Sequence, residues 1–275
     1  MPGLKESLKW KLSSKELSVL PSSFDLVGDI LIFADFPKEL SKKKKLVGKA
    51  LLKLYRQVKV VCVKTRKYSG VYRTPKLAII AGEKRKETVY KENNCLMKLD
   101  VEKCYFSPRL GNERLRVARL VQPNETVLVM FSGVAPYLLV IAKNSKAKAV
   151  YGVEKNPVAH KYALENLKLN KLSNVILKRG DVKSIIPALG LRFDRVLMPL
   201  PKGAEDFLSV AIPCVKRNGV LHFYDFLAEP DFPLAADKIR SACRKLKRKC
   251  TILRTVKCGQ FSPRIFRICV DSRIT

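Results

Sequence analysis

The stretch "VLVMFSGVAPYLLVIAKNS", residues 127–145, has the order of parts found in a nucleotide-binding turn. An apolar run leads into a short loop of small residues, and a helix-like segment follows. Only one glycine, Gly133, lies in the loop. Dinucleotide sites use two more glycines, which let the backbone approach a pyrophosphate. The stretch therefore favours a nucleoside ligand that carries no phosphate.

The segments around this stretch alternate between strand-like and helix-like patterns. Near-continuous apolar strands separated by helices indicate a parallel sheet covered on both faces. Two further strands at 250–259 and 264–273 are expected to be antiparallel at the sheet edge. The expected strands are 126–132, 149–154, 175–181, 193–200 and 219–226, and the expected helices are 136–144, 157–170, 203–216 and 233–248.

The first part of the chain has a different texture, which predicts a small α+β domain. An early helical stretch precedes one strand over 24–36, a basic helix over 41–55 and a strand over 59–64. Short strands of a meander follow between residues 77 and 106. We therefore predict two domains, residues 1–105 and residues 106–275, the second with a Rossmann-like, doubly wound α/β fold.

The charge of the chain points to a polyanionic partner. Lys and Arg number 55 against 24 Asp and Glu, a formal net charge of +31. Such a field attracts nucleic acid through counterion release. The alternative is a lysine-rich proteome in which ordinary proteins are basic.

Other functional classes find little support in the composition. The eight cysteines include no C-x-x-C pair and there are only two histidines, so no metal site is expected. No stretch reaches the roughly 20 apolar residues of a membrane span, and the N-terminal residues lack an apolar signal core. We expect a cytoplasmic protein that uses its cysteines as small apolar residues, and no membrane partner.

Two carboxylates at strand ends suggest how a nucleoside would be held. Glu154 ends the second expected strand, 21 positions after Gly133, where an acid accepts hydrogen bonds from ribose hydroxyls. Asp181 ends the third strand, where it can accept from an adenine amino group. S-adenosylmethionine, with a sulfonium, a ribose and an adenine, fits this pattern. The alternative is that both acids are ordinary loop and cap residues.

Several motifs resemble those of a known family. They include "VYRTPKLAIIAGE" (71–83), "DVEKCYFSPRLGNER" (100–114), "VEKNPVAHKYALENLKLNKL" (153–172) and "MPLPKGAEDFL" (198–208). In this order they resemble the eukaryotic and archaeal tRNA (guanine-N1)-methyltransferases, over about residues 15–270. The resemblance implies a class I methyltransferase domain, preceded by a small domain that helps to hold tRNA. It also implies methylation of the guanosine 3′ of the anticodon, position 37, and we expect a monomer.

The resemblance also assigns roles to individual residues. Glu113 matches the proposed general base and Arg73 the arginine near O6 of the target guanine. Arg109, Pro199 and Leu200 match positions near the substrate base. The implied cofactor contacts are Tyr105, Phe131, Gly133, Val134, Ala135, Glu154, Lys155, Asp181, Val182 and Pro201.

Three departures from the family pattern bear on specificity. The family usually has Asp where Val129 stands, Gly where Ala135 stands and Asn where Pro199 stands. "MFSGVAPY" together with "MPLPKGAEDF" is similar to an archaeal subgroup linked to two reactions. These are N1 methylation of guanosine and C-methylation of a tricyclic wyosine precursor (imG-14 to imG2) at the same nucleotide. We therefore expect a working site with relaxed base selection.

Two other functions also fit the sequence. An aminocarboxypropyl transferase of wybutosine synthesis would use the same cofactor, although "PLP" at 199–201 favours methyl transfer. A tRNA-binding protein with a vestigial pocket would explain the missing Asp and Gly. Glu113 has its own alternative, a salt bridge to Arg114 or Arg116 within "NERLR".

Overall fold

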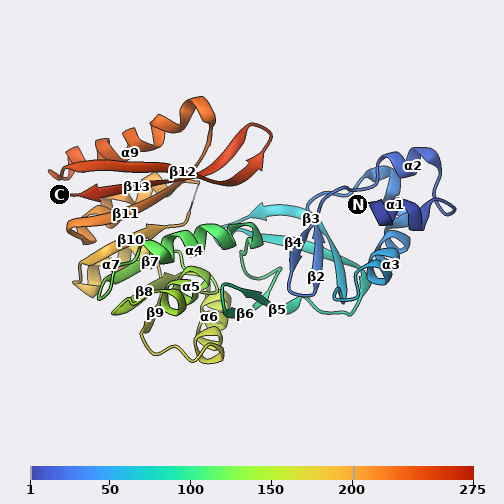
Figure 1. Cartoon of the computed structure of the whole chain (residues 1–275), viewed down its shortest axis with the longest axis horizontal. Helices are drawn as coiled ribbons and strands as arrows, with labels where there is room; N and C mark the ends of the chain where they lie inside the picture. The colour runs from blue at the N-terminus through green and yellow to red at the C-terminus, as the bar shows by residue number, and fades with distance from the viewer. Residues whose placement is uncertain (1, 201) are drawn as a thin grey trace. The chain divides into compact units, whose positions relative to one another are not determined.

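The computed structural model describes residues 2–200 and 202–275, and the chain divides into two compact units. Unit 1 runs up to Lys91 and includes Leu96–Pro108, whereas unit 2 comprises Glu92–Cys95 and Arg109–Thr275. Figure 1 labels the elements of both units, and each unit is described by itself. No helix among the described residues is both long and apolar enough to cross a membrane.

Unit 1 is built on a four-stranded sheet of order β1-β2-β3-β4, in which only β2 and β3 are parallel. A core of buried Leu, Val and Phe side chains joins α1 and α3 to β2 and β3. The strands β5 and β6 form a separate two-stranded sheet. The elements are α1 (Pro2–Leu8), α2 (Ser14–Ser18), β1 (Asp25–Val27), β2 (Ile30–Phe33), η1 (Lys38–Lys43), α3 (Lys44–Leu54), β3 (Val60–Ser69), β4 (Thr74–Gly82), β5 (Glu87–Glu92), β6 (Cys95–Asp100) and η2 (Pro108–Leu110).

The single strand predicted over 24–36 is wrong in detail. The segment is a hairpin of β1 and β2, in which Val27 pairs with Ile30 across Gly28 and Asp29. Gly28 has φ +58°, and a Cβ there would lie 2.2 Å from Thr88 Oγ1. Both conditions require glycine, so this one residue converts a continuous apolar run into two strands.

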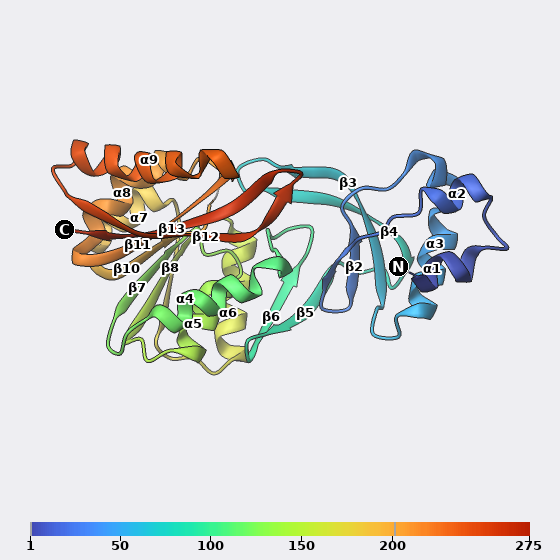
Figure 2. The same cartoon turned by 45° about the horizontal axis from the view of Figure 1, so that its top comes forward.

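Unit 2 contains a seven-stranded sheet of order β12-β13-β11-β10-β7-β8-β9. The strands β7 to β11 are parallel, and β13 is antiparallel to both of its neighbours. Figure 2 shows α7, α8 and α9 on one face of the sheet and α4, α5 and α6 on the other. The elements are α4 (Gly111–Leu120), β7 (Thr126–Met130), α5 (Pro136–Asn144), β8 (Ala149–Glu154), α6 (Pro157–Leu169), β9 (Val175–Arg179), α7 (Val182–Leu189), β10 (Phe193–Met198), η3 (Ala204–Phe207), α8 (Leu208–Ala211), η4 (Ile212–Cys214), β11 (Val215–Ala228), η5 (Glu229–Asp231), α9 (Phe232–Lys245), β12 (Cys250–Ser262) and β13 (Ile265–Ile274).

This order is the class I methyltransferase arrangement, so the predicted doubly wound fold and its antiparallel edge pair are confirmed. The helix predicted over 203–216 is wrong, because only α8 is α-helical there and two 3₁₀ turns flank it. Pro213 has no N–H for a continuing helix. The helices α4 and α7 were not predicted.

Candidate active site

The cofactor crevice of such a sheet lies where the strand order reverses. In unit 2 β7 and β10 are neighbours, whereas β8 and β11 lie on opposite sides of that pair. Loops that follow adjacent parallel strands meet at this switch point, and ligands of open α/β sheets bind there. The described cofactor residues predicted in unit 2 lie in the loop after β7, at the end of β8 and just after it, and at the start of α7.

The loop after β7 is a tight turn in left-handed backbone conformation. Phe131, Gly133 and Ala135 have φ of 55°, 57° and 74°. Ala135 precedes the first turn of α5, where Pro136 occupies a position that needs no N–H. A left-handed alanine costs roughly 1–2 kcal/mol. This strain is a physical reason for the glycine that the resemblance to the family implies at position 135.

Glu154 links the loops after β7 and β8. Its Oε2 accepts a hydrogen bond from the Gly133 N–H at 2.6 Å, and its Oε1 accepts one from the Asn156 N–H at 2.6 Å. Burial raises the pKa of Glu154, and the backbone donors oppose that shift. A carboxylate has about four acceptor sites, so capacity remains for two ribose hydroxyls.

Asp181 caps α7 and pairs with a lysine. Its Oδ1 accepts from the Lys183 N–H at 2.9 Å, and its Oδ2 lies 2.9 Å from Lys155 Nζ. The hydrogen bond from Lys155 is the main cause that lowers the pKa of Asp181. Val182, the first residue of α7, is buried. Both acids therefore have local structural roles as well as a place at the crevice.

The loop after β10 begins with half-buried Pro199 and Leu200. The Leu200 N–H donates to the Met198 carbonyl at 2.7 Å, which turns the chain sharply at Pro199. Pro201 lies outside the described residues. In the loop after β7, the buried Ser132 Oγ has no hydrogen-bond partner among the described residues. Two acids with spare acceptor capacity and an unused hydroxyl fit a nucleoside such as S-adenosylmethionine.

Glu113 is buried on α4 within a set of hydrogen bonds. Arg116 donates to both of its oxygens, at 2.6 and 2.7 Å, and the Tyr224 hydroxyl donates to Oε1 at 2.6 Å. Of the two salt-bridge partners considered from the sequence, the structure selects Arg116. Arg114 instead pairs with Glu92.

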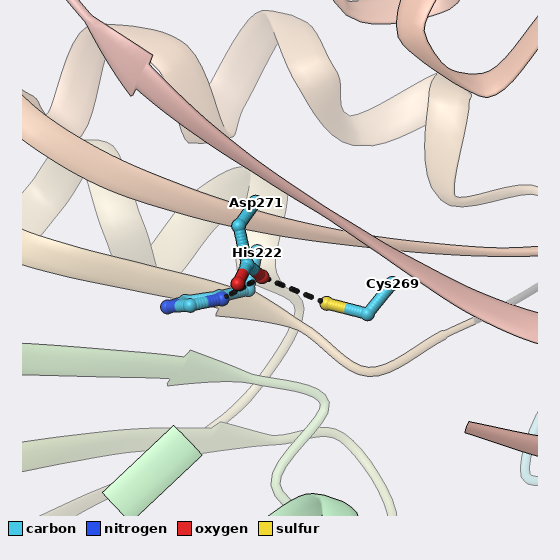
Figure 3. Close-up of side chains that lie close together, drawn as sticks. All are labelled: His222, Cys269 and Asp271. Carbon is cyan, nitrogen blue, oxygen red and sulfur yellow. Dashed lines mark hydrogen bonds and ion pairs between the residues drawn. The ribbon is translucent and has the colours of Figure 1, made fainter. Parts of the chain in front are cut away.

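Arg116 connects Glu113 to a second buried carboxylate, Asp271 on β13. Arg116 Nη1 lies 2.7 Å from Asp271 Oδ2, and Arg254 Nε donates to the same oxygen at 2.7 Å. Figure 3 shows two further contacts of Asp271, with His222 Nδ1 at 2.5 Å and Cys269 Sγ at 3.3 Å. Two buried acids thus share one guanidinium.

His222 is held neutral in one tautomer. Arg195 Nη1 lies 2.8 Å from His222 Nε2, and an arginine can only donate, so Nε2 accepts and Nδ1–H donates to Asp271. Burial lowers the pKa of His222, in agreement with this assignment.

The cluster of His222, Cys269 and Asp271 has donor atoms within 4.8 Å of one another, the spacing of metal ligands. However, both Asp271 oxygens already accept from positive or N–H donors, and His222 Nε2 is committed to Arg195. The guanidinium groups also repel a cation, so this cluster is a hydrogen-bonded network rather than a metal site.

The other predicted residues lie elsewhere in the chain. Arg73, with φ 49°, ends the turn between β3 and β4 in unit 1. The ring of Tyr105, also in unit 1, lies edge-on to Tyr68 with centroids 5.1 Å apart. Arg109 is exposed in η2.

The buried partners of Glu113 were not predicted from the sequence. His222 and Tyr224 alternate along one strand, and Cys269 and Asp271 alternate along another. Polar side chains with period two inside apolar strands share one face of a sheet. This spacing was the available signal.

The architecture and the site together define a class I, S-adenosylmethionine-dependent methyltransferase. The model of the TRM5/TYW2 methyltransferase domain matches residues 88–253, and that of the TYW2 N-terminal domain matches residues 4–85. The chain therefore belongs to the TRM5/TYW2 methyltransferase family, as its motifs suggested.

Three curated relatives show the range of named activities. The chain is 41% identical to tRNA (guanine(37)-N(1))-methyltransferase Trm5b of Pyrococcus abyssi, over 93% of this chain and 76% of the relative. It is 34% identical to tRNA (guanine(37)-N(1))/4-demethylwyosine(37)-methyltransferase Taw22 of Nanoarchaeum equitans, over 82% and 91%. It is 32% identical to the tRNA(Phe) (4-demethylwyosine(37)-C(7)) aminocarboxypropyltransferase of Methanocaldococcus jannaschii, over 91% and 97%.

Solved structures give the same result. Trm5b from Pyrococcus abyssi superposes with a TM-score of 0.87 at 40% identity, covering 96% of this chain and 78% of that chain. A complex of aTrm5 and tRNALeu gives 0.85 at 30% identity, with 100% and 78% covered. Methanocaldococcus jannaschii Trm5 in complex with adenosine gives 0.81 at 32% identity, with 98% and 78% covered. The predicted cofactor class and tRNA-methyltransferase activity are confirmed at the level of the family.

Proposed function

We propose that this protein methylates N1 of the guanosine at position 37 of tRNA and also C-methylates a tricyclic wyosine precursor at that position. The observation that carries the proposal is the half-buried Glu154 carboxylate. It joins the two loops at the switch point of a chain 41% identical to a tRNA (guanine(37)-N(1))-methyltransferase.

The residues of the crevice orient the cofactor. Glu154 accepts from the ribose hydroxyls and Asp181 from the adenine amino group, and the turn at Gly133 leaves room for the nucleoside. Bound S-adenosylmethionine supplies an electrophilic methyl group on its sulfonium. Holding that group in line with the acceptor nitrogen contributes much of the acceleration.

The guanine N1 carries a proton that has to leave as the new bond forms. Glu113 accepts this proton, and Arg73 stabilises the negative charge that moves toward O6. One hydrogen bond to Glu113 has to yield to the incoming base. The Tyr224 hydroxyl exchanges more easily than Arg116, because it makes a single hydrogen bond to Glu113, whereas the positively charged guanidinium makes two.

Dual substrate use is supported by the relatives and by Pro199. The Taw22 relative is named for both reactions, and Taw21 of Saccharolobus solfataricus, 36% identical, is named a 4-demethylwyosine methyltransferase. Pro199 has no amide side chain with which to read a guanine edge, so a bulkier base leaves no group there unpaired.

A second candidate is transfer of the aminocarboxypropyl group. The match of residues 4–85 to the TYW2 N-terminal domain favours it, as does the coverage of 97% of the Methanocaldococcus transferase. The "PLP" sequence at 199–201 favours methyl transfer.

The domain of residues 1–105 is proposed to contact the tRNA, whose negative charge the +31 of the chain complements. We further propose that the protein acts as a monomer, and its cytoplasmic location stays a prediction.

The deciding experiment is incubation of the protein with S-adenosylmethionine and unmodified tRNA, followed by mass spectrometry of the nucleosides. A parallel reaction uses tRNA that carries the tricyclic precursor. A gain of one methyl on guanosine and on the precursor supports the proposal. Addition of an aminocarboxypropyl group would replace it with the second candidate.

A further inference from the structure

The strands β11, β13 and β12 extend beyond the rest of the sheet at the edge that holds the crevice. The last residue of β10, Met198, pairs with Phe223, whereas β11 continues to Ala228. Five extra residues at about 3.3 Å each carry the three strands roughly 16 Å further. Figure 1 shows these strands, in orange and red, continuing past β10. The extension therefore rises beside the loop that begins at Pro199.

One face of this extension carries aromatic rings and a guanidinium. The rings of Phe226 and Phe261 stack with centroids 4.1 Å apart and an interplanar angle of 30°. The guanidinium of Arg267, opposite Phe226 in the register, lies 5.1 Å from the centre of the same ring. Phe261 is 60% exposed, which makes it the most exposed aromatic side chain of unit 2 among the described residues.

This aromatic face continues the face of β11 that contacts Glu113, the proposed general base. Alternate residues of a strand point the same way, so Phe226 follows Tyr224, which donates to Glu113. Glu113 lies in the first turn of α4 and accepts a hydrogen bond from Tyr224 of β11. The N-terminal end of α4 therefore lies beside Tyr224, and Phe226 comes two residues further along the strand. The cluster thus begins one residue pair beyond the buried network.

The chemistry of the cluster fits an unpaired nucleobase. Aromatic rings stack on any base, and arginine adds cation–π and phosphate contacts. Arg264 is exposed in the turn of the hairpin and adds positive charge at its end. A hydrophobic protein partner would be poorly matched to these charges.

We propose that Phe226, Phe261 and Arg267 form a stacking surface for an unpaired base of the tRNA that neighbours the target nucleotide. The inference rests on the proposed function, because it takes tRNA as the ligand of the adjacent site. Its role is to hold the loop of the tRNA while the target base lies in the crevice.

The test compares Phe261→Ala with Leu253→Ala, an exposed apolar residue of the same strand (43% exposed) eight positions away. Loss of one stack should weaken tRNA binding about five- to hundredfold for Phe261→Ala and less than twofold for Leu253→Ala. The salt dependence of binding should stay unchanged, since no phosphate contact is removed. Phe261→Trp should restore affinity, and thermal melting checks that each variant is folded.

Substrates with one abasic nucleotide in the anticodon loop complete the test. For the wild-type protein, an abasic nucleotide at one position next to the target should lower the affinity for tRNA. The Phe261→Ala variant should bind this abasic tRNA and the intact tRNA equally well. Equal tRNA affinities of Phe261→Ala and Leu253→Ala would overturn the inference. Additive losses of binding free energy from the abasic nucleotide and from Phe261→Ala would also overturn it. In that case Phe261 would only shield Phe226 from solvent. Absence of methylation by the wild type would instead refute the proposed function, while the binding cycle still decides on stacking.

Discussion

Replacing Asp271 by asparagine keeps the size of the side chain but removes its charge and one acceptor oxygen. In the folded protein the Asp271 side chain is 2% exposed and accepts from Arg116, Arg254 and His222. The new amide NH₂ would face guanidinium donors and find no acceptor. Removing one partner of a buried ion pair costs about 3–5 kcal/mol. Since Arg116 keeps its hydrogen bonds to Glu113, we expect the free energy of unfolding to fall by an amount near the lower end, about 3 kcal/mol.

The measurement is urea unfolding of wild type and Asp271→Asn at pH 7. The matched control is Asp237→Asn, which breaks an exposed pair with Arg240 of 2.9 Å on α9. That change should cost about 0.5 kcal/mol or less. Equal losses for the two variants would refute the view that Asp271 organises the buried network.

The stability difference between wild type and Asp271→Asn should depend on pH. Burial raises the pKa of Asp271, but His222 and Arg116 outweigh burial and hold the pKa far below its usual range. A carboxyl whose pKa is lowered on folding adds stability above its unfolded pKa and loses it as pH falls toward the folded value. The difference between wild type and Asp271→Asn should be constant above about pH 5 and shrink below about pH 4. A difference that grows on acidification would contradict this.

Four further changes test the site. Glu154→Ala should weaken S-adenosylmethionine binding by about 1–3 kcal/mol in calorimetry, because ribose hydroxyls lose their acceptor, and unchanged affinity would remove Glu154 from the site. Glu113→Gln should lower the single-turnover rate on guanosine about 10²-fold with little change in tRNA affinity, whereas intact chemistry would leave Glu113 only its place in the network. Pro199→Asn should keep N1 methylation and lose methylation of the tricyclic base, measured as the ratio of the two single-turnover rates, and a constant ratio would free Pro199 from base selection. Ala135→Gly should leave stability unchanged or raise it by about 0.5–1 kcal/mol, because relief of a left-handed alanine exceeds the entropy cost of glycine, and a loss above about 1 kcal/mol would argue against that strain.

The sequence predicted the sheet of unit 2 well because its signals are local. Apolar runs of strand length alternate with helical segments, and α5 begins and ends where its pattern indicated, at Pro136 and Asn144. The errors arose where local signals conflict. The run over 24–36 is apolar on both sides of Gly28, and α4 is too rich in charge to show an apolar stripe.

Part of the candidate site could likewise be predicted from local signals, and part could not. The acids at the strand ends follow from spacing, since Glu154 is the last residue of β8 and Asp181 follows β9 by two positions. The partner of Glu113 depends on tertiary packing. Arg116, three positions on, lies on the same side of the helix, and Asp271 reaches it across 155 positions of sequence. A contact between residues so far apart in the sequence leaves no local pattern from which it could be predicted.

The position of β13 bears on how the sheet is assembled. β12 comes first in the chain, yet it joins the sheet only through β13. The edge of β11 thus stays open during synthesis until β13 has been made, and β12 cannot close it alone. The two strands should dock together as a preformed hairpin, late in folding, because distant pairing follows local pairing. Until then β11 presents unpaired backbone groups to other chains. Slow expression or low temperature should therefore improve the yield of folded protein more than changes to the surface of unit 1.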